Sequence, residues 1–460
     1  MASLNKKLSY DPVLTHEGAP AQRVNAEKEL RRSVMACLLW EDSFYEDGVS
    51  IADRISSLVA KVKPEIVSAI AIEARSKMNL RHVPLLLACE MAKNYGGRIV
   101  ADTIFEIIQR ADELAEFLAV YWRNGKCPLS AQVKKGLARA FQKFNEYQLA
   151  KYNRDSEVKL RDVLFLCHAS PKDEAQDTIW KKLIAGTMAI PDTWETELSA
   201  GKDKKATFER LIAENKIGAL ALLRNLRNMN ESKVSETIVK EALAKANYSR
   251  VLPFRFLAAA RACPAYEEYL DLAMFSMLET QTKIPGKTIV VIDISGSMSQ
   301  VLSSKSDMNR MDAACALGAI MREICEEPRI YATSGNDSTR QHATALIPNR
   351  RGMALVDAIK QMQLTLGGGG IFLNPVMRWI KEREESADRI VVITDEQDCA
   401  INPKESPLNA DAFGKENYLI NVQVDEHGIG YGKWAHIDGF SENVIRYIQQ
   451  SEITTPQSVI

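Results

Sequence analysis

The strongest constraint on the fold lies in residues 288–299, which read Thr-Ile-Val-Val-Ile-Asp-Ile-Ser-Gly-Ser-Met-Ser. A run of β-favouring residues leads to one aspartate, and two serines follow at a spacing of two. Such runs are typical of buried strands. Open α/β sheets bind ligands at the carboxyl ends of their strands. The run therefore predicts an α/β domain in the last third of the chain, with Asp293, Ser295 and Ser297 at its binding edge.

A second apolar run, residues 389–394, ends directly before Asp395. Neighbouring parallel strands end at the same edge of a sheet, so this carboxylate is expected beside Asp293. Carboxylate and hydroxyl oxygens suit a hard divalent cation, Mg²⁺ above all. No nucleophile–base pair stands out among the six histidines and eight cysteines. The sequence therefore predicts a metal-dependent binding site and not an enzyme.

The chain of 460 residues is too long for one ordinary domain. Residues 26–280 have a helical texture, and many helices joined by short turns favour a stack of helical repeats. One predicted helix spans residues 130–150. The turn at Pro285-Gly286 separates this part from the α/β part. We expect a polar, loosely attached N-terminal segment (1–25), a helical domain (26–286) and an α/β domain (287–460).

Strands and helices alternate in the last part, which predicts a parallel, doubly wound sheet. Strands are expected at 288–294, 329–333, 389–394 and 418–424, with helices near 309–326, 353–364, 374–385 and 441–450. No apolar stretch approaches the ~20 residues that span a bilayer. The first residues are not followed by the apolar core of a signal peptide, and no C-x-x-C pair occurs, so we expect a cytoplasmic protein with reduced thiols.

The net charge of −1 divides into +5 over residues 1–286 and −6 over residues 287–460. A basic first part suits a polyanion, although a solvated helical surface has the same composition.

The constellation Asp293, Ser295, Ser297 and Asp395 resembles the metal-ion-dependent adhesion site of von Willebrand factor A domains. That family adds a threonine from a glycine-rich loop. The loop is present here at residues 366–371, but Gly370 occupies the position expected for the threonine. Two interpretations stay open: a Mg²⁺ site with four of its five side chains, or a scaffold whose site binds no metal.

Three segments ahead of this domain, residues 151–171, 221–229 and 252–258, are similar to the TROVE module of the Ro autoantigen and its bacterial relatives. The resemblance implies a ring of HEAT-like repeats closed by the A-like domain. It also implies an RNA-binding ribonucleoprotein that holds single-stranded 3′ ends of misfolded RNA in the ring hole and Y-like RNA on its outer basic surface. Roles in quality control of noncoding RNA, and an exoribonuclease partner, belong to the same family.

The resemblance carries the RNA-contact role to Lys151 and His168, and less directly to Arg154, which stands one position before the family's arginine. Arg224 and Arg227 are further candidates because they share one helix face. Each has a plainer interpretation. His168 is otherwise a core histidine at a helix end, and the lysine and arginines are otherwise a solvated surface.

Two other functions compete with RNA binding. A protein-interaction adaptor would use the A-like site, where an acidic group of a partner completes the coordination of the cation. A metal-dependent nuclease would need several carboxylates around paired cations, and Glu396 and Asp398 lie in the loop after Asp395.

Overall fold

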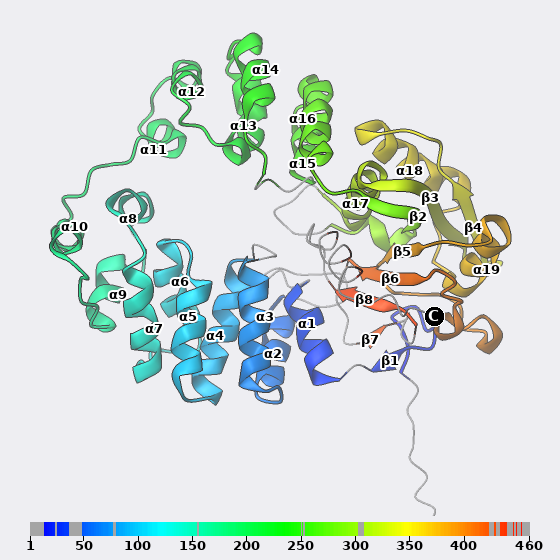
Figure 1. Ribbon diagram of the computed structural model, residues 1–460, viewed down its shortest axis with the longest axis horizontal. Coiled ribbons are helices and arrows are strands. Elements are labelled where there is room, and N and C mark those ends of the chain that lie inside the picture. The colour runs from blue at the N-terminus through cyan, green and yellow to red at the C-terminus, as the bar shows by residue number, and fades with distance from the viewer. Residues whose placement is uncertain are drawn as a thin grey trace, which may run out of the picture. The chain divides into compact units, whose positions relative to one another are not determined.

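The computed structural model describes residues 13–422, 427–428, 433–438, 445, 448 and 452, with gaps at 24, 36–47, 77–79, 154–155, 250, 252–253 and 302–307. The chain forms two compact units (Figure 1). One combines the described residues up to Asn25 with Leu278–Phe440, and the other contains the helices in between. No described helix is long and apolar enough to cross a membrane.

The helical unit is a succession of short helices, as the sequence predicts (Figure 1). They are α1 (Ala26–Met35), α2 (Gly48–Val59), α3 (Pro64–Ser76), α4 (His82–Asn94), α5 (Arg98–Ile107), α6 (Asp112–Tyr121), α7 (Ala131–Phe141), α8 (Glu146–Tyr152), α9 (Leu160–Leu166), α10 (Glu174–Ala185), α11 (Trp194–Ser199), α12 (Lys204–Ala213), α13 (Ala219–Glu231), α14 (Glu236–Lys245), α15 (Phe254–Ala262) and α16 (Glu267–Glu279). Helices contact both the next helix and the next but one, as in α3–α4, α3–α5, α4–α6 and α5–α7. This pattern is that of stacked helical repeats.

The helix predicted over residues 130–150 is instead two helices, α7 and α8. The Asn145 side chain accepts a hydrogen bond from the Gln148 backbone N–H (2.9 Å), and the Gln148 side chain accepts one from the Asn145 N–H (3.0 Å). Such a capping box satisfies the free donors of a new helix start. The continuous apolar pattern concealed this break, and α8 consequently begins one turn before Lys151.

One continuous apolar core runs from Leu30 in α1 to Leu183 in α10. Phe117 and Phe141 are fully buried in it, and the Trp180 ring packs edge-on against Phe141 at 5.3 Å between centroids. Burial of large aromatic side chains supplies most of the stabilisation of such a core. Tyr121 and Trp180 therefore pack in the core and are unavailable for base stacking.

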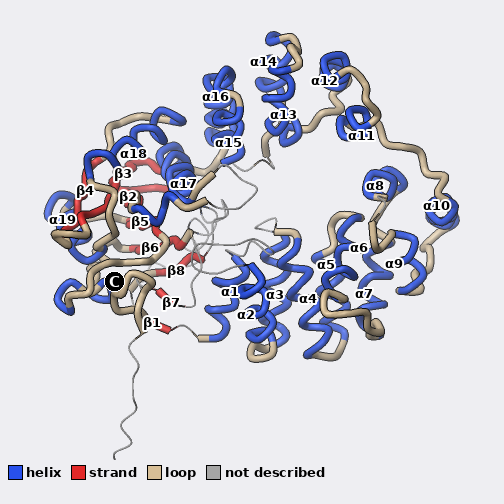
Figure 2. The backbone as a smooth tube through the Cα atoms, turned by 180° about the vertical axis from the view of Figure 1, so that it is seen from behind, coloured by secondary structure: helices blue, strands red, loops and turns tan. Residues whose placement is uncertain are grey.

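The α/β unit contains a six-stranded sheet with strand order β4-β3-β2-β5-β6-β8 (Figure 2). Its strands are β2 (Ile284–Asp293), β3 (Cys325–Asn336), β4 (Gln341–Leu346), β5 (Arg389–Thr394), β6 (Glu416–Asn421) and β8 (Ala435–Asp438). All neighbours are parallel except β4, which is antiparallel to β3. The expectation of a purely parallel sheet was therefore wrong at this edge, and β4 and β8 were not predicted.

Helices cover both faces of the sheet. Alternate residues of β2 point to opposite faces, so each face has apolar side chains against which a helix can pack. Ile289 and Val291 join a core cluster with α19 (Leu373–Glu384). Ile292 faces the other way, toward α17 (Arg310–Ile324). The latter packs with α18 (Gly352–Leu366). The predicted doubly wound α/β architecture is confirmed.

The chain reverses its winding direction at β2, which lies between β3 and β5. Ile292 pairs with Ile393, so the two strands end together. Ligands bind at such switch points in open α/β sheets. The fold thus brings Asp293 and Asp395 to one edge.

The described part of the N-terminal segment, from residue 13, is attached to the α/β unit, contrary to the loose attachment that we expected. Thr15 donates a hydrogen bond from its side-chain hydroxyl to the Asp398 carbonyl (3.0 Å). β1 (Gln22–Arg23) pairs antiparallel with β7 (His427–Gly428). The composition of the segment did not predict this attachment, because backbone pairing between strands needs no apolar pattern. The predicted helix at 441–450 lies mostly outside the described residues.

Candidate functional site

Asp293 is the last residue of β2 and is fully buried. Its Oδ1 accepts a hydrogen bond from the Ser295 backbone N–H (2.8 Å), and its Oδ2 accepts one from the Thr394 hydroxyl (2.7 Å). Thr394 is the last residue of the neighbouring strand β5. These two bonds fix the carboxylate at the carboxyl edge of the sheet.

The two predicted serines lie together in the turn after β2. Ser295 Oγ and Ser297 Oγ are 3.2 Å apart. Adjacent ligands of an octahedral Mg²⁺, each about 2.1 Å from the ion, are separated by about 3.0 Å. The separation of the hydroxyls therefore fits two neighbouring positions around one hard cation.

Asp395 follows β5 and is also buried. Its Oδ2 lies 3.3 Å from Nη1 of Arg310, whose side chain is buried as well. Arg310 opens α17, where Asn309 and Asp312 form a capping box. A buried ion pair is stable only when both charges are kept together. The carboxylate that the sequence assigned to the metal is therefore already held by a guanidinium.

The buried carboxylates of this edge have unusual proton affinities. Burial, and then the negative charge of Asp395, raise the pKa of Asp293 to about 7. Burial also raises the pKa of Asp398 to about 7, although its oxygens accept backbone hydrogen bonds from Leu373 and Ala400, each at 2.7 Å. Desolvation disfavours the charged form of a carboxyl group, and a nearby cation would oppose that effect.

Gly370 has no room for the threonine of the resembled family. A Cβ atom built on it would lie 1.9 Å from Cys399 Sγ and 3.0 Å from Cys399 Cβ. Cys399 therefore fills the volume that a side chain at position 370 would occupy. The glycine-rich loop nevertheless lies at the site, because a Cβ on Gly296 would meet the Gly368 carbonyl at 3.3 Å.

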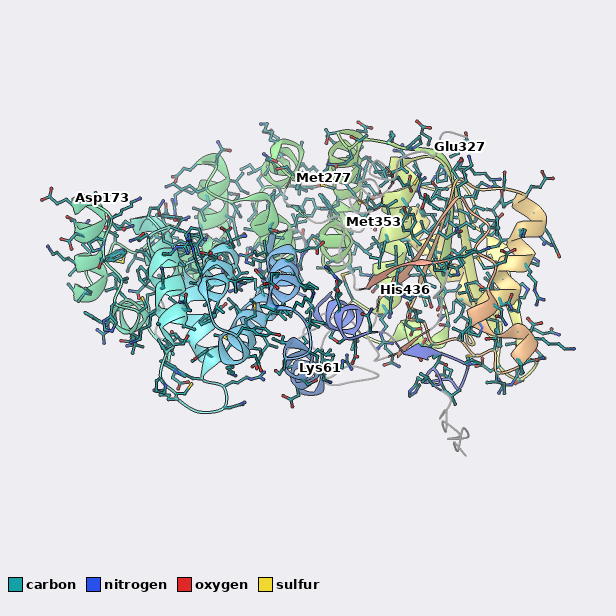
Figure 3. The ribbon with its side chains drawn as sticks, turned by 60° about the horizontal axis from the view of Figure 1, so that its bottom comes forward. Lys61, Asp173, Met277, Glu327, Met353 and His436 are labelled. Carbon is teal, nitrogen blue, oxygen red and sulfur yellow. The ribbon has the colours of Figure 1, made fainter. Side chains whose placement is uncertain are left out.

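A metal-dependent nuclease would need a cluster of carboxylates. In the described part of the chain, no three His, Cys, Asp or Glu side chains are arranged to hold a metal. The carboxylate of Asp398 accepts the backbone N–H groups named above. Glu396 lies 3.0 Å from Nδ1 of His436 on β8, a residue labelled in Figure 3. A cation at this edge would depend on serine hydroxyls, as in an adhesion-type site. The donor set fits one such cation held by Asp293, Ser295 and Ser297, with Asp395 shared with Arg310.

The predicted RNA contacts lie on the helical unit. Lys151 is in the last turn of α8, with Nζ 5.8 Å from the centre of the Tyr152 ring. It lines a hollow of about 530 Å³ together with Asn153, Met188, Ile190 and Thr196. Ile190 is 84% exposed, which is unusual for so large an apolar side chain.

His168 follows α9 and is exposed. Its φ of 52° is in the left-handed region, where the chain leaves the helix. The interpretation of His168 as a core histidine is therefore wrong. Arg154 lies outside the described residues.

Arg224 and Arg227 are both exposed on α13, on the face opposite its buried residues. Arg227 Nε is 3.9 Å from Glu231 Oε1, an exposed pair that contributes little stability. Their placement is compatible with both predictions, the RNA-facing pair and the solvated surface.

Thr394, Arg310 and Cys399 are the residues of the A-like site that sequence reasoning missed. Thr394 stood directly before Asp395, so its position was a usable signal. Arg310 and Cys399 come from elements distant in sequence, and only the fold brings them to the site.

Helical repeats followed by a doubly wound domain with an Asp-x-Ser-x-Ser turn define a class of two-part proteins with an A-like domain. The sequence matches the TROVE domain family over residues 15–186 and 175–327, and the chain belongs to this family.

Known relatives agree with this assignment. The chain has the fold of the Ro (RSR) protein of Deinococcus radiodurans, with a TM-score of 0.62 and 17% identity, covering 93% of this chain and 100% of that one. It is 23% identical over 349 residues to telomerase protein component 1 of Rattus norvegicus, covering 54% of this chain. It is also 37% identical over 89 residues to that of Mus musculus, covering 17% of this chain. The chain spans only 13% and 3% of those two proteins.

Proposed function

We propose that this protein is an RNA-binding protein of the Ro type that holds the single-stranded 3′ ends of small noncoding RNAs. The observation that carries the proposal is the exposure of His168 together with the placement of Lys151 at an open hollow, within a chain of the TROVE family. Lysine neutralises phosphate, and an exposed histidine can hydrogen-bond or stack on an unpaired base.

The finer parts of the proposal follow the family resemblance. The tail is held in the hole of a Ro-type ring, and Y-like RNA binds an outer basic surface. The protein acts as an RNA chaperone in quality control in the cytoplasm, with an exoribonuclease as its partner. The positive net charge of residues 1–286 supports a polyanionic ligand.

Fluorescence anisotropy on one RNA hairpin, with and without a single-stranded 3′ tail, tests the proposal. We expect the tail to confer tight binding, and Lys151→Ala/His168→Ala to weaken it by roughly tenfold or more, because each phosphate or base contact contributes about 1 kcal/mol or more. Affinity should fall steeply between low and physiological salt. Lys181→Ala, an exposed lysine of α10, is the matched control.

Equal binding of both hairpins, or no effect of the double change, would contradict the ring-hole assignment. If neither RNA binds at low salt, RNA binding fails altogether. The adaptor function, centred on Asp293 and Asp395, then becomes the better proposal.

We also propose that Asp293, Ser295 and Ser297 bind Mg²⁺ when it is supplied. The Oγ–Oγ separation and the buried carboxylate support this assignment. We expect millimolar Mg²⁺ to raise the melting temperature of the natural chain, because a ligand that binds only the folded state stabilises it. Asp293→Asn should abolish that rise. A rise of equal size in the variant would place the cation elsewhere.

A further inference from the structure

Strand β4 forms one edge of the six-stranded sheet, and in the part of the chain that the structure describes it pairs only with β3 (Figure 1). An edge strand presents backbone N–H and C=O groups on its outer side. Those groups can pair with another extended chain.

The register shows which residues of β4 face outward. The backbone N–H of Ile347, just after the strand, donates to the Ile330 carbonyl (2.8 Å). Successive residues of an antiparallel strand point their backbone groups to alternate sides. His342, Thr344 and Leu346 therefore direct their N–H and C=O groups away from β3.

This edge lacks the usual protection against pairing. Residues 341–346, Gln-His-Ala-Thr-Ala-Leu, include no proline and no lysine. Their pairing with β3 continues over six residues without a bulge. Natural proteins block exposed edges with prolines, lysines or bulges. An edge without them is therefore a candidate for strand addition.

A basic hollow of about 510 Å³ lies at the first residues of β4. Arg340, His342, Arg378 and Glu405 line it, together with apolar side chains that include Phe372 and Ile401. Ile401 is 47% exposed, so the apolar part of the lining is open to solvent at that point.

The two arginines keep donors for a ligand. Arg340 Nη1 donates to the Cys399 carbonyl (3.1 Å), and Arg378 Nη2 donates to Glu405 (2.5 Å). A guanidinium has five N–H donors, so each retains others. Arg340 also has a φ of 53°, a backbone conformation that persists only where its surroundings hold it.

The electrostatic environment at His342 has a positive sign. Burial, followed by the charges of Arg378 and Arg383, lowers the pKa of His342, although Glu405 acts in the opposite direction. An anionic group in the hollow would relieve this repulsion. With Arg340 and Arg378 in its lining, the hollow suits a carboxylate.

We propose that an extended acidic segment of a partner protein adds to the sheet as a strand along β4 and places a carboxylate between Arg340 and Arg378. Strand addition uses backbone hydrogen bonds for affinity and an adjacent pocket for specificity. Nucleic acid has no backbone ladder that matches a strand edge, so a peptide is the better occupant. The residues of this surface are in the α/β unit, and none of them is among those proposed to bind RNA.

Fluorescence anisotropy of a labelled ten-residue peptide of alternating valine and glutamate, added to the full-length protein, tests the proposal. Arg340→Glu/Arg378→Glu is expected to weaken binding at least about tenfold, because two favourable charges become repulsive. Thr344→Pro should weaken it similarly, because proline removes an outward N–H at a position where edge strands tolerate it.

Controls separate these effects from misfolding. Thr344→Val keeps the outward N–H and should bind within about twofold of the natural chain. Arg98→Glu reverses the charge of one exposed residue of α5, as each of the two changes does in the hollow, and should bind normally. The far-ultraviolet circular dichroism of Thr344→Pro should match the natural chain.

Other occupants give different outcomes, and each would overturn the proposal. A peptide of alternating valine and lysine that binds equally well would remove the role of the arginines. Competition by single-stranded RNA that depends on Arg340 would make nucleic acid the occupant. Self-association in sedimentation that Thr344→Pro abolishes would make a second copy of this chain the occupant.

Discussion

Gly370→Thr is expected to destabilise the α/β unit by about 1–3 kcal/mol, the usual cost of an overpacked site. A Cβ at position 370 would lie 1.9 Å from Cys399 Sγ. The sulfur belongs to a buried cluster with Phe372 and Ala400, so it has little space to move. Chemical denaturation of the full chain, monitored by a signal that reports on the α/β unit, measures this loss in free energy of unfolding.

A second change should rescue the first. Cys399→Ala removes the sulfur, and Gly370→Thr/Cys399→Ala is expected to recover at least about 1 kcal/mol relative to the sum of the single effects. The same double variant supplies the threonine hydroxyl of the resembled adhesion-type site, so it should bind Mg²⁺ more tightly than the natural chain. Additive single effects would show that Cys399 does not occupy this volume.

Arg310→Met is expected to cost about 3–5 kcal/mol, because it leaves the buried carboxylate of Asp395 without its guanidinium. The neighbouring Asp293 carboxylate adds to the uncompensated charge. A divalent cation can neutralise both groups, so Mg²⁺ should stabilise the variant more than it stabilises the natural chain. Melting temperatures with and without Mg²⁺ measure this difference.

Arg310→Lys is the matched control, because it retains a positive charge on a shorter side chain. It should be intermediate in stability and in its response to Mg²⁺. A methionine variant that is as stable as the natural chain, and equally insensitive to Mg²⁺, would show that Arg310 does not neutralise this edge of the sheet.

The buried strands of the α/β unit were predictable because their composition is decisive. The run predicted at 389–394 is β5 itself, since consecutive β-branched residues have few other stable arrangements. β4 contains no such run, and its half-exposed edge position removes the apolar signal. Its existence depends on pairing with β3, which a local pattern does not encode.

The site was predictable only where it is local in sequence. Asp293, Ser295 and Ser297 follow one strand, and Asp395 follows another predicted strand. Their roles as metal ligands remain predictions. The Arg310 pairing with Asp395 links residues 85 apart and depends on where α17 packs against the sheet.

The residues proposed to contact RNA show the same limit. The position of Lys151 depends on the capping box formed by Asn145 and Gln148. These side chains indicate a helix start, but the apolar pattern alone predicted one uninterrupted helix. The exposure of His168 depends on the end of α9, where φ changes sign. Helix ends are decided by local hydrogen bonds, so periodicity locates a helix better than its boundaries.

The attachment of the N-terminal segment has a consequence for synthesis. Thr15 finds its hydrogen-bond partner 383 residues later, in the loop after β5. At ~5–20 residues per second, translation separates the two by roughly 20 to 80 s. The helical unit makes local contacts. It can therefore fold before the hydrogen-bond partner of Thr15 has been synthesised. Completion of the α/β unit then follows folding of the helical unit, and it ties the segment around Thr15 to the loop after β5.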